Sequence, residues 1–331
     1  MIRRALPLAL AALLLVACGL DRPEVARVGD RTLGFDQLRN AVALRRSLAD
    51  LQGIPCGQKA GGETQRSACS RQALSGELLW LAVAPYAEQH GLGPSEAQIR
   101  QAVGQLEAQV GGEPLDTALT AHHVTREDLN ELGRKLLTIR DVRLAVALHR
   151  AGEARLRALY QQQALDFTSI QVDHILVKTR GEAEAVYRQV KEAGEARFVA
   201  VAKRVSIEPG AKERGGELGT NVASTFDPAF ARAAVALDEG QVSRPVHTSL
   251  GWHVIYLVDK EVTSFDEAKP RIVDSIADQE FRAWLRQRAR SLQIEVNPRY
   301  GRFVPGSFSV VPVLSTDPEA GTATPSPSSS P

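Results

Sequence analysis

Two apolar stretches decide the fold of this chain: VDHILV at residues 172–177 and GWHVIYLV at residues 251–258. Both are rich in β-branched or aromatic residues, which predicts two buried strands of a sheet. Each stretch carries one histidine, His174 or His253, among residues that we expect to be buried. Phe226 and Phe230 lie between the two stretches and suggest a small aromatic pocket. Two histidines beside such a pocket predict a site that binds an apolar group and needs neither a metal nor a nucleophile. The alternative is that both are structural core histidines.

The segment between these strands is predicted to complete a small α+β domain. Apolar residues at helical spacing indicate helices at residues 182–193, 197–206 and 228–237. A further strand is expected at residues 243–248, directly before the second apolar stretch. The expected architecture is a small antiparallel or mixed sheet covered by helices.

Residues 167–261 resemble the parvulin-type (PpiC, or rotamase) peptidyl-prolyl cis-trans isomerases. The resemblance rests on motifs that follow one another in the family's order. These motifs are HILV at 174–177, GGELG at 215–219, the Phe226 and Phe230 pair, LDEGQVS at 237–243, PVHT at 245–248 and GWHVI at 251–255. The resemblance implies a parvulin fold and catalysis of X-Pro isomerisation.

The same resemblance implies roles for individual residues. His174 and His253 match the paired site histidines, Thr248 matches the threonine beside the second histidine, and Glu208 stands where the family usually has aspartate. These four are the predicted catalytic residues. Three apolar side chains are predicted to bind the substrate by lining the proline pocket: Leu218, Phe226 and Phe230. No cofactor and no metal is implied.

The chain departs from the family pattern at positions close to this site. Glu208 reaches one carbon further than aspartate, which changes the geometry around it. Thr220 and Asn221 replace the usual aromatic pair after the glycines, and Leu250 replaces what is often a small or polar residue. These departures leave open an alternative, a catalytically weak holdase that uses the parvulin fold to bind clients.

The flanking regions predict a helical domain that the isomerase domain interrupts. Helices are expected from residue 35 to residue 163, and one more spans about residues 264–292. This last helix carries Phe281 and Trp284, which need a hydrophobic partner. The N-terminal helices are the simplest partner. This organisation resembles the SurA/PrsA type of exported foldase, in which an all-α chaperone domain holds unfolded chains.

The first residues have the pattern of an export signal. Arg3 and Arg4 precede an apolar run at residues 5–16, which is shorter than the ~20 residues that span a bilayer. LVAC at residues 15–18 resembles the bacterial lipobox, which implies cleavage before Cys18 and lipid attachment to its thiol. The alternative is an ordinary signal peptide in which Cys18 is incidental.

The two remaining cysteines and the overall charge give weaker information. Cys56 and Cys69 lie in a polar, glycine-rich stretch of an exported chain, so a disulfide is possible, and two free thiols are the alternative. Of 331 residues, 40 are Lys or Arg and 39 are Asp or Glu. A net charge of 40 − 39 = +1 gives no electrostatic case for nucleic acid as a partner.

These observations divide the chain into six expected segments. They are a signal peptide (1–17), a lipid-anchored tether (18–23), a helical chaperone-like domain (24–165), a parvulin domain (166–262), a returning helix (263–300) and an extended, disordered tail (301–331). We expect an isomerase and chaperone of the cell envelope, anchored to the outer face of a membrane. Its expected partners are unfolded or newly exported proline-containing polypeptides, and a less favoured alternative is the maturation of one dedicated client.

Overall fold

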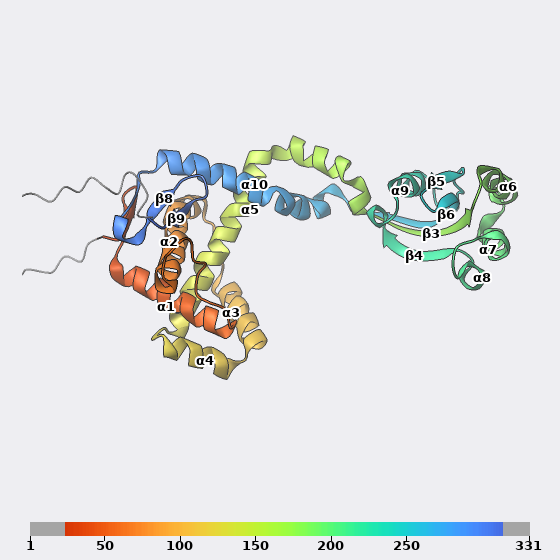
Figure 1. Ribbon diagram of the computed structural model, residues 1–331. Coiled ribbons are helices and arrows are strands. Elements are labelled where there is room, and N and C mark those ends of the chain that lie inside the picture. Colours follow the sequence, from red (N-terminus) through yellow and green to blue (C-terminus); the bar gives the residue numbers. More distant parts are fainter. Residues whose placement is uncertain (1–23, 314–331) are drawn as a thin grey trace, which may run out of the picture. The chain divides into compact units, whose positions relative to one another are not determined.

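The computed structural model describes residues 24–313. The predicted signal peptide, Cys18 and most of the predicted tail lie outside the described residues. Two compact units make up the described chain: residues 24–142 with 282–313, and residues 143–281. The first unit is therefore discontinuous in sequence, and each unit is described by itself (Figure 1).

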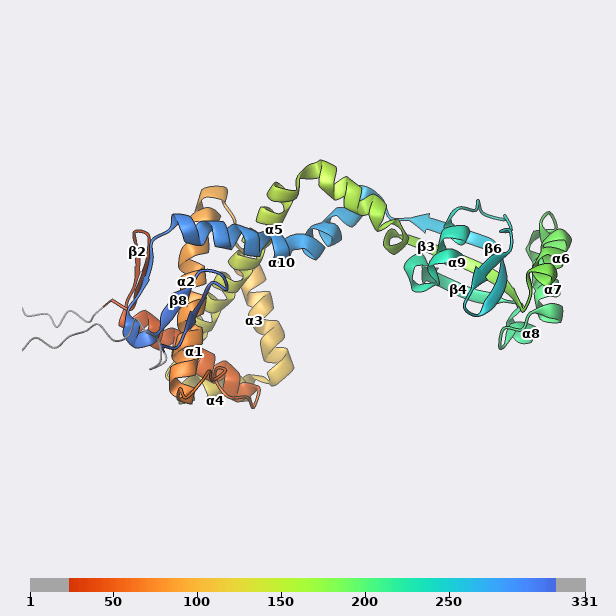
Figure 2. The same cartoon turned by 45° about the horizontal axis from the view of Figure 1, so that its top comes forward.

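The unit of residues 143–281 is built around a four-stranded antiparallel sheet in the order β4-β3-β6-β5. The two long central strands are the apolar stretches that carry the histidines. The strands are β3 (Thr168–Val177), β4 (Glu217–Val222), β5 (Val246–Thr248) and β6 (Gly251–Val262), and the helices are α6 (Arg180–Val190), α7 (Gly194–Val205), α8 (Ala211–Arg214) and α9 (Pro228–Val235). This is the α+β architecture that the sequence predicts, a small antiparallel sheet covered by helices, and its labelled elements can be followed in Figures 1 and 2.

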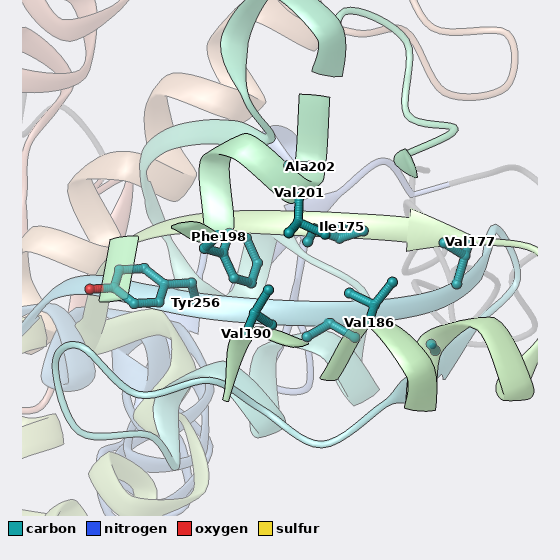
Figure 3. Packing of buried hydrophobic residues seen from close by; sticks show 10 residues of the cluster. Ile175, Val177, Val186, Val190, Phe198, Val201, Ala202 and Tyr256 are labelled. Carbon is teal, nitrogen blue, oxygen red and sulfur yellow. The ribbon is translucent and has the colours of Figure 1, made fainter. Parts of the chain in front are cut away.

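The sheet separates two hydrophobic cores. On one face α6 and α7 pack against β3 and β6, and Figure 3 shows Phe198, Val201 and Val186 gathered on Ile175. On the other face α9 places Phe230 against Ile170 and Val172. Since side chains alternate along a strand, His174 shares the second face with Val172, the face that α9 covers.

Local signals in the sequence explain where the helices of this unit begin. The Thr179 hydroxyl accepts a hydrogen bond from the N–H of Glu182, and the Glu182 carboxylate accepts one from the N–H of Thr179, so α6 starts with a capping box. Asp227 caps α9, and Pro228 occupies the first turn, where a missing N–H costs nothing. The part of α5 (Arg126–Gln162) from residue 143 onward and the part of α10 (Phe265–Ser291) up to residue 281 also belong to this unit.

The other unit is mainly helical. Its helices are α1 (Phe35–Leu51), α2 (Gln65–His90), α3 (Glu96–Val110), α4 (Gly112–Ala121) and the beginning of α5 (Arg126–Gln162), and the end of α10 (Phe265–Ser291) joins them. Leu44, Leu115, Leu119 and Leu129 form a buried core between α1, α4 and α5. The returning helix contacts α2 through the Trp284 and Tyr86 rings, whose centroids are 5.4 Å apart. No helix within residues 24–313 is both long and apolar enough to cross a membrane.

Small sheets accompany these helices. The strands are β1 (Ala26–Val28), β2 (Arg31–Leu33) and β7 (Ile294–Val296) in one sheet, and β8 (Arg302–Val304) and β9 (Ser309–Val311) in a hairpin. The hairpin lies in the segment predicted as a disordered tail from residue 301, so that prediction was wrong for residues 302–311. Val310 is buried, and its N–H donates to Ser75 on α2 at 2.9 Å. Figures 1 and 2 show the hairpin beside α2.

A disulfide joins Cys56 and Cys69, whose Cα atoms are 5.1 Å apart. Cys69 is buried at the start of α2, whereas Cys56 belongs to the polar loop that precedes this helix. The bond therefore ties the loop between α1 and α2 to the helical core.

Asp173 predicts an unusual pH dependence of stability. It is buried on the α6 and α7 face, where burial, followed by the charges of Glu195 and Glu217, raises its pKa to about 6. The unfolded pKa is near 4, so the folded state binds the proton more tightly. The contribution of Asp173 to stability is therefore full below pH 4 and is lost as pH rises through 6, by about 3 kcal/mol at most.

We expect Asp173→Asn to remove this loss, because asparagine is neutral and similar in size. Urea unfolding from pH 4 to 7, read from hydrogen exchange of the β3 and β6 amides, measures the effect. The buried histidines act equally in both proteins, so the stability of the variant relative to the wild-type chain should increase as pH rises from 4 to 6. Parallel curves for the two proteins would contradict this assignment.

Candidate functional site

The two predicted histidines meet on the α9 face of the sheet. His174 lies on β3 and His253 on the adjacent β6, and both side chains are buried. Their Nδ1 atoms are 3.0 Å apart, and the rings are stacked with centroids separated by 5.3 Å. The antiparallel register pairs His174 with Ile255 and His253 with Leu176, which places the imidazoles diagonally across the strand pair.

Thr248 extends this contact into a chain of hydrogen bonds. Its Oγ1 accepts a hydrogen bond from the N–H of Leu250 at 3.2 Å and lies 2.7 Å from His253 Nε2. We infer that the threonine hydroxyl donates to Nε2, so the proton of His253 sits on Nδ1 and is donated to His174 Nδ1. His174 then carries its own proton on Nε2.

Glu208 lies at the far end of this chain. The distance from His174 Nε2 to Glu208 Oε2 is 3.7 Å, beyond hydrogen-bonding range. His174 Nε2 is buried and has no hydrogen-bond partner among residues 24–313. A buried polar atom without a partner is uncommon and costs about 1–3 kcal/mol.

Ser206 was not predicted, yet it holds the loop that carries Glu208. Its Oγ accepts hydrogen bonds from the N–H of Leu176 at 3.1 Å and from the N–H of Glu208 at 3.3 Å. The N–H of Ile207 donates to the Leu176 carbonyl at 2.9 Å. The signal for Ser206 was its position directly after the apolar stripe of α7, where a short polar side chain can bond neighbouring backbone.

The predicted substrate-binding residues form an apolar surface against the imidazoles. The Phe226 and Phe230 rings stack with centroids 5.1 Å apart. Phe230 meets His253 edge-on at 5.4 Å and His174 at 5.9 Å. Phe230 is buried, whereas Phe226 and Leu218 are half-buried and extend the surface toward solvent. The structure thus brings all seven predicted residues of the site into one region.

Both histidines are neutral at neutral pH. Burial, followed by the charges of His253 and Arg214, lowers the pKa of His174 to about 4. Burial also lowers the pKa of His253, although the nearby Asp227 acts in the opposite direction. Neutral imidazoles each offer one donor and one acceptor, as the hydrogen-bond chain requires.

The low pKa of His174 predicts a flat pH profile. Any reaction that depends on the neutral pair should keep a constant kcat/KM from pH 6 to pH 8 and lose activity below pH 5, with a midpoint near 4. The same profile measured on Asp173→Asn excludes a contribution from that carboxyl. A midpoint near 6.5, the ordinary value for histidine, would contradict the assignment.

The arrangement suits binding and reorientation rather than bond cleavage. The site presents an apolar aromatic surface, two neutral imidazoles, a hydroxyl and one carboxylate. Within residues 24–313 no cluster of three or more His, Cys, Asp or Glu side chains is placed to hold a metal ion.

Comparisons with known proteins show which family the sequence around this site matches. Residues 173–259 match the family model described as a PPIC-type PPIase (rotamase) domain. The chain is 33% identical over 149 residues to Chaperone SurA of Sodalis glossinidius (strain morsitans), covering 40% of this chain and 34% of that protein. It is 43% identical over 109 residues to Foldase protein PrsA of Clostridium botulinum, covering 31% of this chain and 32% of that protein. The aligned part therefore spans about a third of each of these curated relatives.

Among solved structures, NmPin, the parvulin of Nitrosopumilus maritimus, is 32% identical with a TM-score of 0.25, and the match covers 28% of this chain and 97% of that one.

Proposed function

Since residues 173–259 form a PPIC-type, parvulin-class peptidyl-prolyl isomerase domain, we propose that this chain isomerises X-Pro bonds in unfolded polypeptides and also holds them as a chaperone. The observation that carries the proposal is the contact of Phe230 with both members of the neutral histidine pair. An apolar ring bound there would lie against imidazoles that are themselves fixed by hydrogen bonds.

The mechanism follows from the chemistry of the amide. Rotation about the peptide bond faces a barrier of ~18–20 kcal/mol because resonance gives the C–N bond partial double-bond character. Leu218, Phe226 and Phe230 would hold the pyrrolidine ring while the preceding carbonyl turns out of the amide plane. A site that binds the twisted amide more tightly than either planar isomer lowers the barrier. No covalent bond forms or breaks.

The hydrogen-bonded residues act as positioning groups in this mechanism. His174 and His253 support the edge of Phe230, and Thr248 fixes the orientation of His253. Glu208 would accept the Nε2 proton of His174 once it closes the gap of 3.7 Å. A rigid imidazole pair keeps the apolar surface in the shape that fits the twisted proline.

A protease-free isomerisation assay on the full chain tests the activity. With a proline tetrapeptide whose cis and trans forms differ in fluorescence, we expect the relaxation rate to rise in proportion to protein concentration. A relaxation rate that stays at the uncatalysed value while circular dichroism shows a folded protein would remove the enzymatic proposal.

The rival function is a holdase with little catalytic power, and the open distance between His174 and Glu208 is what favours it. The Glu208→Asp variant distinguishes the isomerase from the catalytically weak holdase. If glutamate supports full activity, the variant should show an equal or lower kcat/KM. If glutamate is what weakens the site, aspartate should raise the rate several-fold. Suppression of the aggregation of an unfolded client should be the same for both proteins under either function.

Export and a lipid anchor at Cys18 belong to the proposal on the strength of the leader sequence. The chain would then act in the cell envelope, on the outer face of a membrane. Mass spectrometry of the mature N-terminus should find a diacylglyceryl-modified Cys18, and Cys18→Ala should release the protein from membranes. An unmodified N-terminus at another residue would leave an ordinary exported protein.

A further inference from the structure

A second candidate binding site lies in the helical unit, away from the histidine pair. Its groove has a volume of about 400 Å³ and lies between α1, α2 and α5. The lining is apolar along its length and polar at its rim. The lining residues that carry the argument are Trp80, Leu132, Leu136, Arg45, Glu77 and Lys135.

The apolar lining continues the hydrophobic core outward. Leu129 is buried in the core of the helical unit, Leu132 is half-buried against it, and Leu136 is 57% exposed one turn later on α5. Ile139 follows at the next helical position and also lines the groove. The half-buried indole of Trp80 lines the same groove. An apolar stripe that continues from the core to the solvent-exposed surface is typical of a binding surface.

The charges at the rim are unevenly matched. Lys135 pairs with Glu77 at 2.8 Å, and their side chains are 21% and 13% exposed. Asp128 accepts hydrogen bonds from Asn40 and Thr125, and Glu131 pairs with Arg134 at 2.9 Å. Each carboxylate of the lining thus has a partner.

Arg45 differs from Lys135 because its side chain has a neutral partner rather than a carboxylate. Its guanidinium donates to the neutral amide of Gln72 at 2.8 Å. Arg45 forms no ion pair with a carboxylate of residues 24–313, so it can pair with a carboxylate beside an apolar group bound in the groove, whereas Asp128, whose partners are neutral, keeps its negative charge at the rim.

We propose that this groove binds segments of unfolded polypeptide that place a bulky apolar side chain next to an acidic residue. The inference rests on the proposed chaperone function and names the segment that this function would recognise. The apolar side chain would lie between Trp80 and Leu136, and the carboxylate would pair with Arg45. A second copy of this chain is the competing occupant.

Two glycines provide a matched pair of variants for the test. Gly76 lines the groove in the middle of α2, and Gly104 lies in the middle of α3 outside it. A Cβ atom added at either position meets no atom within 4 Å. Gly76→Trp should therefore fill the groove, and Gly104→Trp should add the same side chain to an exposed helix elsewhere.

Binding is measured on the full chain by fluorescence polarisation of labelled twelve-residue peptides. The peptides contain a Leu-Phe-Leu core flanked by aspartates or by lysines, and they contain no proline, so they do not report on the isomerase site. We expect the aspartate peptide to bind at least tenfold more weakly to Gly76→Trp than to the wild type, and with unchanged affinity to Gly104→Trp. Equal binding to the wild type and Gly76→Trp would overturn the proposal.

Arg45 is tested by reversing its charge. Arg45→Glu should reverse the preference for aspartate over lysine peptides, whereas Arg45→Lys should keep it. An unchanged preference in Arg45→Glu would overturn the acidic part of the proposal. Sedimentation that shows a dimer broken by Gly76→Trp would overturn it in favour of a second copy as the occupant.

The isomerisation assay distinguishes this inference from the proposed catalytic function. Gly76→Trp should keep the wild-type kcat/KM on the proline tetrapeptide. A chain that isomerises proline but binds neither peptide retains the enzymatic function and loses this inference. A chain that binds the aspartate peptide but lacks isomerase activity retains this inference and loses the proposed enzymatic function.

Discussion

Gly216→Ala should unfold the isomerase domain or leave it severely weakened. Gly216 has a φ of +90°, and a Cβ placed on it would lie 2.2 Å from the carbonyl oxygen of His174 and 3.3 Å from the Cβ of Ala202. The Gly216 carbonyl accepts the N–H of His174 at 2.9 Å, so the backbone cannot move away without losing this bond. We expect a loss of more than ~3 kcal/mol, measured by urea unfolding.

Gly219→Ala is the matched control for this variant. Gly219 also has a positive φ, +70°, but a Cβ there meets nothing within 4 Å. It therefore carries only the conformational cost of about 1–2 kcal/mol. Equal losses for the two variants would show that backbone conformation, rather than the contact with His174, decides the effect.

Phe230→Ala should lower kcat/KM for X-Pro isomerisation by at least ~100-fold, because the ring joins the apolar surface to both imidazoles. Deleting a buried phenylalanine also costs about 3–5 kcal/mol of stability. Loss of activity alone would therefore not distinguish a missing pocket from a weakened fold.

Phe198→Ala supplies the comparison. Phe198 is fully buried in the core on the opposite face of the sheet, packed with Val201 and Tyr256. Its deletion should cost a similar stability but leave the site intact, so the folded fraction should keep activity within a few-fold of the wild type. Equal loss of activity in both variants, at a temperature where both are folded, would contradict the role of Phe230.

The sequence predicted the isomerase domain well because its signals are local. The two apolar stretches predicted the neighbouring strands that carry His174 and His253, and apolar residues at helical spacing located α6, α7 and α9. The family motifs identified the seven site residues, and the structure places these residues in one region. The distance between His174 and Glu208 was not predictable, since it depends on the loop that Ser206 holds by hydrogen bonds.

Elements that depend on distant partners were missed. The hairpin of β8 and β9 is held to α2 by Arg71, which donates to the Val310 carbonyl at 3.0 Å across 239 positions of sequence. No local pattern reports such a contact. The groove of Trp80 and Leu136 was missed for a related reason, because a regular apolar stripe on α5 predicts a helix but does not say which of its residues remain uncovered.

The most direct test of the account is the exchange between the cis and trans forms of a proline peptide, measured by NMR at equilibrium with the full chain. We predict that catalytic amounts of protein raise the exchange rate in both directions by the same factor at pH 7, leave the cis fraction unchanged, and lose this effect in Phe230→Ala. Exchange that stays at the uncatalysed rate with folded wild-type protein would contradict the central claim that this aromatic and histidine site turns the peptide bond.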